Sequence, residues 1–320
     1  MPYKARFFSL LAGGVLLATT AACGSGAAQT AAPGGAAGDK PTVVAAFYPL
    51  QWLTEQIAGQ DVTVQTLTAP GVEPHDLELT PQQVAGVGGA TMTVYIKGLQ
   101  PAVDEAVEQN GADKGFDAAA AVQTLPATAE EEAEGGEAAH EHEHEHEHEV
   151  SYDPHLWLDP NRFAGVATKL GERLAAADPA HAQDYKERAA KAVTALGALD
   201  QEFTKGLATC STRSIVTAHE AFGYLADRYK LKQVGISIDP EAEPSPARVA
   251  EVAKVAKAEK VTTIFTEALV STKVAEVLAT EVGAKTAVLD PMESQPSGGD
   301  YLSAMRGNLT TLRTALGCTA

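Results

Sequence analysis

Short apolar runs alternate with segments of helical periodicity along most of this 320-residue chain. The predicted strands are rich in β-branched and other apolar side chains, and they cover residues 42–47, 62–68, 92–96, 214–218, 233–238, 262–266 and 286–289. The predicted helices lie between and after these strands, at residues 51–58, 81–87, 102–110, 221–229, 246–259, 271–282 and 301–316. Strands that alternate with helices form parallel sheets. The pattern therefore predicts an α/β fold with two parallel-sheet lobes, at residues 41–160 and 209–320.

Between the lobes, residues 161–208 form a predicted helical region that includes one long linking helix. Asp178 is its expected N-cap, Pro179 lies in its first turn, and the helical pattern continues to about Leu207. Apolar side chains recur along it at three- and four-residue spacing, at Ala182, Tyr185, Ala189, Ala192, Val193, Leu196, Leu199 and Phe203. Such a helix is about 42 Å long, which predicts a single rigid connection between the lobes. A dimeric coiled coil is the alternative, but the alanine-rich stripe favours close packing within the chain.

The N-terminus predicts export and a membrane anchor. Lys4 and Arg6 precede an apolar run, and small residues then lead to Cys23. This order is typical of a signal peptide, here residues 1–22, followed by a lipid-modified cysteine. A lipoprotein signal usually has Leu where this chain has Thr20, so a plain signal peptide followed by an unpaired cysteine is the alternative.

Two further segments have a composition that does not suit a folded core. Residues 23–40 are mostly Gly, Ala and other small residues, which predicts a flexible tether. Residues 127–150 form a predicted acidic loop in which histidine alternates with glutamate, at His140, His142, His144, His146 and His148. Because neutral imidazole binds zinc, copper and nickel, we interpret this loop as an accessory metal collector. An acidic solubilising insertion or a purification tag is the alternative.

Charge and cysteine content limit the partners of the protein. The formal net charge is −18 at pH 7, which argues against binding nucleic acid or an anionic lipid surface through a basic patch. The membrane is instead expected to be reached through the lipid anchor. Besides Cys23, the only cysteines are Cys210 and Cys318, and two cysteines in an exported chain are expected to form a disulfide. A pair of buried free thiols is the alternative.

Three single histidines lie where a strand or loop passes into a helix. They are His75 in Glu-Pro-His-Asp, His155 in Asp-Pro-His-Leu-Trp-Leu-Asp-Pro, and His219 in Ala-His-Glu-Ala-Phe. Ligands of parallel α/β sheets bind beyond the carboxyl ends of the strands, so these side chains are expected to converge. Asp290, directly after an apolar strand, is the predicted fourth ligand, although capping a turn before proline suits it equally well. Such a set would hold Zn²⁺, and cobalt, nickel or manganese could also occupy it.

At these residues the sequence resembles the zinc-uptake solute-binding proteins of ABC transporters. The similarity includes the motifs around the three histidines, the acidic His-rich insertion, and Phe265-Thr266-Glu267 followed later by Leu289-Asp290-Pro291, and it covers the chain from residue 42 onward. It implies two α/β lobes joined by one long rigid helix, with a metal in the cleft between the lobes. It also implies that His75, His155 and His219 bind this metal, and some members add a carboxylate at the position of Asp290.

The resemblance also bears on the choice of metal. Manganese-binding relatives tend to have an acidic residue where this chain has His219, which favours zinc here. Some zinc-binding members have a glutamate directly before the first histidine. This chain has Pro74 at that position and Glu73 one residue earlier, so an acidic ligand from this loop is not expected.

The predicted function is capture of Zn²⁺ outside the membrane and its delivery to the permease of a metal ABC transporter. The protein is expected to be an exported, lipid-anchored monomer that catalyses no reaction. A manganese-binding or mixed zinc- and manganese-binding protein of the same transporter class is the alternative. An exported zinc hydrolase with Glu220 as general base is a remote alternative, because a fourth ligand from Asp290 would close the site. An adhesin of the same fold is a third.

Overall fold

The computed structural model describes residues 40–127 and 152–319. The predicted signal peptide, the lipidation site at Cys23, nearly all of the tether and the five histidines of the acidic loop lie outside these residues. Within the two described ranges, no helix is both long enough and apolar enough to cross a membrane.

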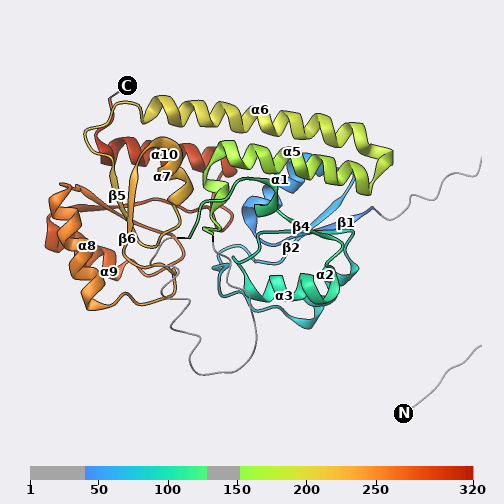
Figure 1. The fold of residues 1–320 in the computed structure, drawn as a ribbon, viewed down its shortest axis with the longest axis horizontal. Coiled ribbons are helices and arrows are strands. Elements are labelled where there is room, and N and C mark those ends of the chain that lie inside the picture. The colour runs from blue at the N-terminus through green and yellow to red at the C-terminus, as the bar shows by residue number, and fades with distance from the viewer. Residues whose placement is uncertain (1–39, 128–151, 320) are drawn as a thin grey trace, which may run out of the picture. The chain divides into compact units, whose positions relative to one another are not determined.

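The N-terminal lobe contains a four-stranded parallel sheet with the strand order β2-β1-β3-β4 (Figure 1). Its strands are β1 (Thr42–Ala45), β2 (Thr63–Thr66), β3 (Met92–Tyr95) and β4 (Gly115–Asp117). Its helices are α1 (Tyr48–Ala58), α2 (Pro81–Gly89), α3 (Pro101–Asn110) and the short 3-10 helix η1 (Ala119–Ala121). Each α-helix has a proline in its first turn, where the missing N–H costs nothing. Strand β4 was not predicted, because its Gly-Phe-Asp sequence is only partly buried and has no apolar run.

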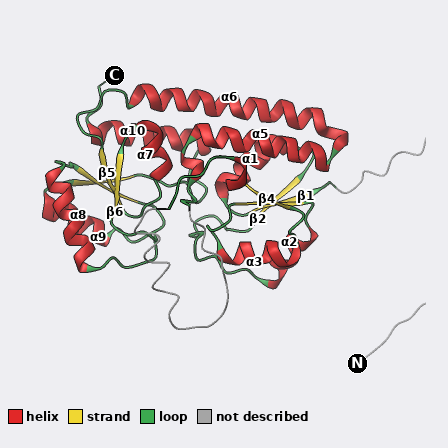
Figure 2. Ribbon diagram, in the orientation of Figure 1, coloured by secondary structure: helices red, strands yellow, loops and turns green. Residues whose placement is uncertain are grey.

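The C-terminal lobe repeats this arrangement with the strand order β6-β5-β7-β8, again all parallel. Its strands are β5 (Ser214–Thr217), β6 (Lys232–Gly235), β7 (Thr263–Thr266) and β8 (Lys285–Val288). Its helices are α7 (Gly223–Tyr229), α8 (Pro246–Ala258), α9 (Lys273–Val282) and α10 (Tyr301–Leu316). Figure 2 shows two separate groups of strands, each flanked by helices. The predicted fold class, two parallel-sheet α/β lobes, is therefore confirmed.

The linking region contains two long helices rather than one. These are α5 (Pro160–Ala177) and α6 (Ala182–Gly206), with the 3-10 helix η4 (Pro179–His181) between them. Helix α6 crosses both lobes, since it contacts α1 and α5 on one side and α10 on the other (Figure 1). Its N-cap is His181, three residues later than predicted. The carboxylate of Asp178 is hydrogen-bonded to His181 Nδ1 and the Tyr185 hydroxyl, both at 2.7 Å, so it does not cap the helix.

Ion pairs attach α6 to both lobes. Arg188 on α6 donates to main-chain carbonyls at the end of α1 and to Asp61 Oδ2 at 2.6 Å. Farther along the helix, Asp200 accepts two hydrogen bonds from the guanidinium of Arg228 on α7, each at 2.8 Å. Because these contacts lie on opposite sides of the lobe boundary, α6 restrains the position of one lobe against the other.

Among the described residues, the larger of two hydrophobic core clusters extends from β1 through α5 and α6 to α10, and a smaller one lies beneath α8 and α9. Within the larger cluster, Trp52 of α1 stacks on Tyr301 of α10, with ring centroids 4.8 Å apart. Trp157 is fully buried and donates from Nε1 to the carbonyl of Pro291 at 2.7 Å. Residues from both halves of the chain thus share one packed interior, and the loops that leave it are held firmly.

Cys210, before β5, and Cys318, after α10, form a disulfide. The bond joins the end of the described chain to the start of the C-terminal lobe and spans 108 residues. In the chain-entropy view, closing a loop of this length stabilises the folded state by about 4–5 kcal/mol.

The close approach of α5 and α6 at Gly171 gives a test of the linking pair. A Cβ added at Gly171 would lie 2.5 Å from the Cβ of Ala189 on α6, and neither atom could move without shifting a helix. Gly171→Ala is therefore expected to reduce the free energy of unfolding. Overpacking costs about 1–3 kcal/mol, which exceeds the gain of up to about 1 kcal/mol in helix propensity. Urea unfolding followed by circular dichroism would measure the change.

Gly197→Ala is the matched control, because it makes the same substitution on α6 where no atom lies within 4 Å of the added Cβ. It is expected to stabilise the protein by about 0.5–1 kcal/mol through helix propensity alone. Stabilisation by both variants would show that the helices can separate at little cost, contrary to the close packing described above.

Candidate metal centre

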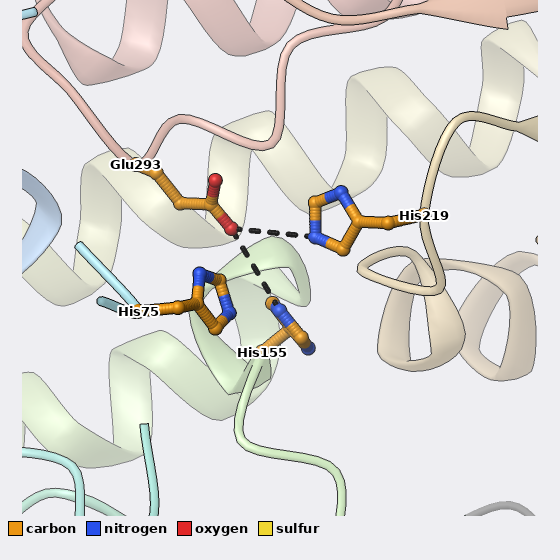
Figure 3. A group of neighbouring side chains, drawn as sticks. All are labelled: His75, His155, His219 and Glu293. Atoms are coloured by element: carbon orange, nitrogen blue, oxygen red, sulfur yellow. Dashed lines mark ion pairs between the residues drawn. The ribbon is translucent and has the colours of Figure 1, made fainter. Parts of the chain in front are cut away.

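Three histidines and one glutamate from four separate segments point toward one another (Figure 3). His75 lies between β2 and α2, and His155 directly precedes the 3-10 helix η3 (Leu156–Leu158). His219 follows β5, and Glu293 lies between β8 and α10. One ligand atom from each residue lies within 4.8 Å of the others, and the imidazole centroids are 5.5–5.8 Å apart. The fold thus brings together the three histidines singled out in the sequence.

The first two histidines share a local arrangement that orients the imidazole ring. Asp153 Oδ1 accepts a hydrogen bond from the backbone N–H of His155 at 2.9 Å and lies 2.7 Å from its Nδ1. Glu73 makes the corresponding contacts with His75: Oε2 accepts its backbone N–H at 2.9 Å, and Oε1 lies 2.5 Å from its Nδ1. A ring that donates its Nδ1–H to a carboxylate leaves Nε2 available as a metal ligand.

The third histidine receives its carboxylate from a neighbouring strand. Glu267, directly after β7, accepts the backbone N–H of His219 at 3.1 Å and lies 2.7 Å from its Nδ1. Strands β5 and β7 are adjacent in the parallel sheet, so their carboxyl ends bring these two residues side by side. In each case a buried or part-buried carboxylate fixes the ring from the side opposite the cluster.

The centre of the cluster contains buried polar atoms that no hydrogen bond satisfies. Nε2 of His155, Nε2 of His219 and Oε1 of Glu293 are buried, and none has a partner among the described residues. Glu293 Oε1 lies 3.7 Å from His155 Nε2 and 3.6 Å from His219 Nε2. Two ligands of a tetrahedral zinc ion, each about 2.0–2.2 Å from the metal, lie roughly 3.3–3.6 Å apart. The spacing therefore suits an ion between these atoms, which would otherwise be costly to bury.

Electrostatics keep two of the donors in the form that binds a cation. Burial, together with the neighbouring His219 and His75, lowers the pKa of His155 well below its usual value, so this ring is neutral at pH 7. Burial acts to raise the pKa of Glu293, but the close approach and positive charge of His219, with the nearby imidazoles of His75 and His155, outweigh it and hold that pKa at about 2. A neutral imidazole and an ionised carboxylate are both ready to act as ligands.

The other two rings carry positive charge more readily. Burial acts to lower the pKa of His219, but Glu267 and Glu293 outweigh it and raise the pKa well above its usual value. The hydrogen bond with Glu73 likewise overcomes burial and raises the pKa of His75. A bound metal would replace these protons as the partner of the surrounding carboxylates.

Asp290, the predicted fourth ligand, is not part of this cluster, and Glu293 is the carboxylate found there. Oδ1 of Asp290 accepts the backbone N–H of Met292 at 2.8 Å, and its backbone N–H and carbonyl are hydrogen-bonded to the side chain of Asn308. Asp290 thus caps a turn, the alternative role considered from the sequence. Met292 has φ of 65°, in the left-handed region, and this turn directs the next side chain to the histidines. No sequence pattern distinguishes the two carboxylates of this loop.

The carboxylates that orient the rings were also missed as functional residues, although a signal for two of them was present. Glu73 and Asp153 each stand two residues before a candidate histidine, a spacing that lets one carboxylate bind both the backbone N–H and the ring. Glu267 had no such local signal, because its partner lies 48 residues away.

Glu220, the general base in the hydrolase alternative, lies outside the cluster. Its Oε1 accepts hydrogen bonds from the backbone N–H of Gly235 and from the guanidinium of Arg248, each at 3.3 Å. A Cβ at Gly235 would overlap the side chain of Glu220. Glu220 therefore packs against β6 and pairs with α8 instead of facing the histidines.

Comparison with known families matches residues 43–315 to the ZnuA family, described as zinc-uptake complex component A, periplasmic. The chain is 34% identical over 313 residues to the high-affinity zinc uptake system protein ZnuA of Bacillus subtilis, covering 92% of this chain and 93% of that protein. It is 34% identical over 286 residues to the zinc-binding lipoprotein AdcA of Streptococcus pneumoniae. That match covers 86% of this chain but 55% of AdcA, so the chain spans about half the length of this relative.

Solved structures share the fold. The zinc-bound ZnuA-like domain of Streptococcus pneumoniae AdcA superposes with a TM-score of 0.70 at 33% identity, covering 87% of this chain and 99% of that domain. The laminin-binding protein Lmb of Streptococcus agalactiae, described as a bifunctional protein with adhesin and metal transporting activity, gives a TM-score of 0.73 at 30% identity, with coverage of 86% and 99%. Since the family match extends over nearly all of the described residues and the two-lobed fold agrees with it, this chain belongs to the ZnuA family of zinc-uptake components.

Proposed function

We propose that this protein captures Zn²⁺ outside the cytoplasm and delivers it to the membrane permease of an ABC transporter. The observation that carries the proposal is the set of buried imidazole and carboxylate atoms that converge without hydrogen-bond partners among the described residues. The names of its relatives, a zinc uptake protein and a zinc-binding lipoprotein, support the same function.

The ligand types favour zinc over manganese. Three imidazole nitrogens with one carboxylate oxygen suit a borderline-soft ion that accepts four ligands in a tetrahedron. Manganese prefers sites with more carboxylate, carbonyl and water oxygens and a higher coordination number. A preference for Mn²⁺, or equal affinity for both ions, is the outcome that would identify the alternative member of the transporter class.

The same ligand set favours capture over hydrolysis. A catalytic zinc site keeps one coordination position for water, whereas His75, His155, His219 and Glu293 would together supply all four ligands of a tetrahedral ion. The glutamate that could have served as general base is paired with an arginine elsewhere in the lobe. Both features suit a protein that binds its metal as cargo.

Export and anchoring complete the proposal. We infer that the mature protein is a monomer held at the membrane through a lipid on Cys23, as the name of the AdcA relative suggests for that protein. The acidic His-rich loop would collect zinc weakly and raise its concentration near the tight site.

A metal titration tests the cluster. In the signal-free protein lacking residues 139–149, we expect one tightly bound Zn²⁺ per chain and much weaker binding of Mn²⁺, measured by competition with a chromophoric chelator. The combined substitutions His75→Ala, His155→Ala and His219→Ala remove three of the four proposed ligands and should abolish the tight site. Tight binding that survives them would mean that these histidines are structural.

The identity of the carboxylate ligand is tested by a matched pair of substitutions. Glu293→Gln removes an anionic ligand and is expected to weaken zinc affinity at least about 100-fold, more than the 10–100-fold typical of outer-shell changes. Asp290→Asn makes the same chemical change three residues earlier, and its amide oxygen can still accept the Met292 N–H. It should alter affinity by less than about 3-fold. A larger loss of zinc affinity in Asp290→Asn than in Glu293→Gln would identify Asp290 as the ligand instead.

Removal of the acidic loop tests its proposed role as a collector. Cells whose protein lacks residues 139–149 are expected to take up zinc normally when the metal is plentiful and more slowly when a chelator makes it scarce. Uptake should be measured with radioactive zinc across a range of free concentrations. Equal uptake by both proteins under chelation would reject the collector role and leave the tight site unaffected.

A further inference from the structure

We propose that Gly223 and Tyr224, at the start of α7 in the C-terminal lobe, are positioning residues for His155, the histidine that belongs to the segment before α5. They act through Asp153, the carboxylate that orients the His155 ring. This inference rests on the proposed metal-binding function and concerns residues that do not themselves bind the metal.

The hydroxyl of Tyr224 holds the main chain on which Asp153 lies. It donates to the Asp153 carbonyl at 2.7 Å and accepts the backbone N–H of Leu125 at 3.0 Å. The N–H of Asp153 in turn donates to the Leu125 carbonyl at 3.0 Å. One fully buried side chain from the C-terminal lobe therefore closes a hydrogen-bonded set with two strand-like segments of the other half.

The ring of Tyr224 is fixed as well as its hydroxyl. The guanidinium carbon of Arg162 on α5 lies 4.8 Å from the ring centroid. Arg162 also donates to Asp159 Oδ2 at 2.8 Å, to the carbonyl of Gln123 at 3.0 Å and to Asp227 Oδ2 on α7 at 3.4 Å, so contacts from both sides hold it in place. The side chain of Tyr224 thus extends from α7 and is held by Leu125, Asp153 and Arg162, which precede the C-terminal lobe in the chain.

Gly223 acts on the side chain of Asp153 directly. A Cβ added at this glycine would overlap Asp153 Oδ2. The other oxygen, Oδ1, binds both the backbone N–H and Nδ1 of His155. Because the two oxygens belong to one planar group, displacing Oδ2 moves Oδ1 and turns the imidazole. Glycine at position 223 therefore allows the carboxylate to reach its orienting position.

These contacts make His155 depend on the lobe that supplies the other half of the ligand set. Gly223 lies four residues after His219, and α7 continues directly from that ligand loop. A movement that separated the lobes would withdraw His219 and Glu293 from the site. It would also free Asp153, so that His155 would lose its orientation in the same step.

The test compares Gly223→Ala and Tyr224→Phe with Tyr229→Phe in the full exported chain. Tyr229 lies at the other end of the same helix, and its hydroxyl binds Asp200 on α6 instead of the His155 loop. Zinc affinity is measured against a strong chelator that keeps weaker sites empty. We expect a loss of about 10–100-fold for Gly223→Ala, as for other outer-shell changes, about 3–10-fold for Tyr224→Phe, and less than 2-fold for Tyr229→Phe.

Two readouts separate positioning from a general loss of stability. The visible absorption spectrum of the Co²⁺-loaded protein reports ligand geometry, and it should change in Gly223→Ala and Tyr224→Phe but not in Tyr229→Phe. In a His155→Ala background, Gly223→Ala should cause no further loss of affinity, because the two changes act through one ligand.

An unchanged cobalt spectrum, or additive losses with His155→Ala, would overturn the inference even if the variants were less stable. If Gly223→Ala did not fold, Tyr224→Phe would decide the matter, since it removes a single oxygen. A parent protein that bound no zinc at all would instead reject the proposed function.

Discussion

Four donor atoms have to meet in a buried space without satisfying one another, and most of the structure serves this requirement. Imidazole and carboxylate groups placed this close would normally rotate into hydrogen bonds. Here Nε2 of His155 and of His219 remain 3.6–3.7 Å from Glu293 Oε1 and have no hydrogen-bond partner among the described residues. Each unsatisfied buried group costs about 1–3 kcal/mol, and a cation at the centre would recover this cost. The carboxylates on the Nδ1 atoms prevent the rings from turning to avoid it.

The rigid frame around the site follows from the same requirement. Ligands drawn from two lobes keep their spacing only if the lobes do not slide past each other. Helix α6 is tied to the N-terminal lobe through Arg188 and to the C-terminal lobe through Asp200. The stacking of Trp52 on Tyr301 joins α1 to α10 within one core. A close-packed interior resists small displacements, so sub-ångström differences in ligand position can be maintained.

The sequence predicts those features of the fold that recur along the chain, namely the alternating strands and helices. The alternation of apolar runs and amphipathic helices is sufficient for two parallel sheets, and parallel topology places residues such as His75 and His219 at the same ends of their strands. The long link was predicted from an apolar stripe that is in fact buried, yet α5 was not recognised as its close partner. Pairing of two helices depends on contacts such as Gly171 with Ala189, which no periodicity reveals.

Single backbone angles and long-range pairs explain what the sequence does not predict. Glu293 faces the histidines and Asp290 does not because the chain makes a left-handed turn at Met292. Methionine rarely adopts this conformation, and the neighbouring residues contain no pattern that predicts it. Glu267 lies 48 residues from His219 in the sequence and reaches it only because β5 and β7 are adjacent in the sheet. Local patterns can therefore identify the histidines, whereas the partners that orient them require the fold.

A protein that captures a metal as cargo must also give it up, and the rigidity that favours binding opposes release. If one ligand side chain rotated away from the metal, the other ligands would remain in place. The carboxylate bound to Nδ1 of each imidazole would also oppose the rotation. Separation of the lobes avoids this difficulty, because His219 and Glu293 leave together and the contacts at Gly223 release Asp153 from behind His155. A partner that binds both lobes would then need to supply free energy only for breaking the contacts between them, and loss of the metal would follow from the geometry. The same contacts that make the closed site tight would thereby make its opening cooperative.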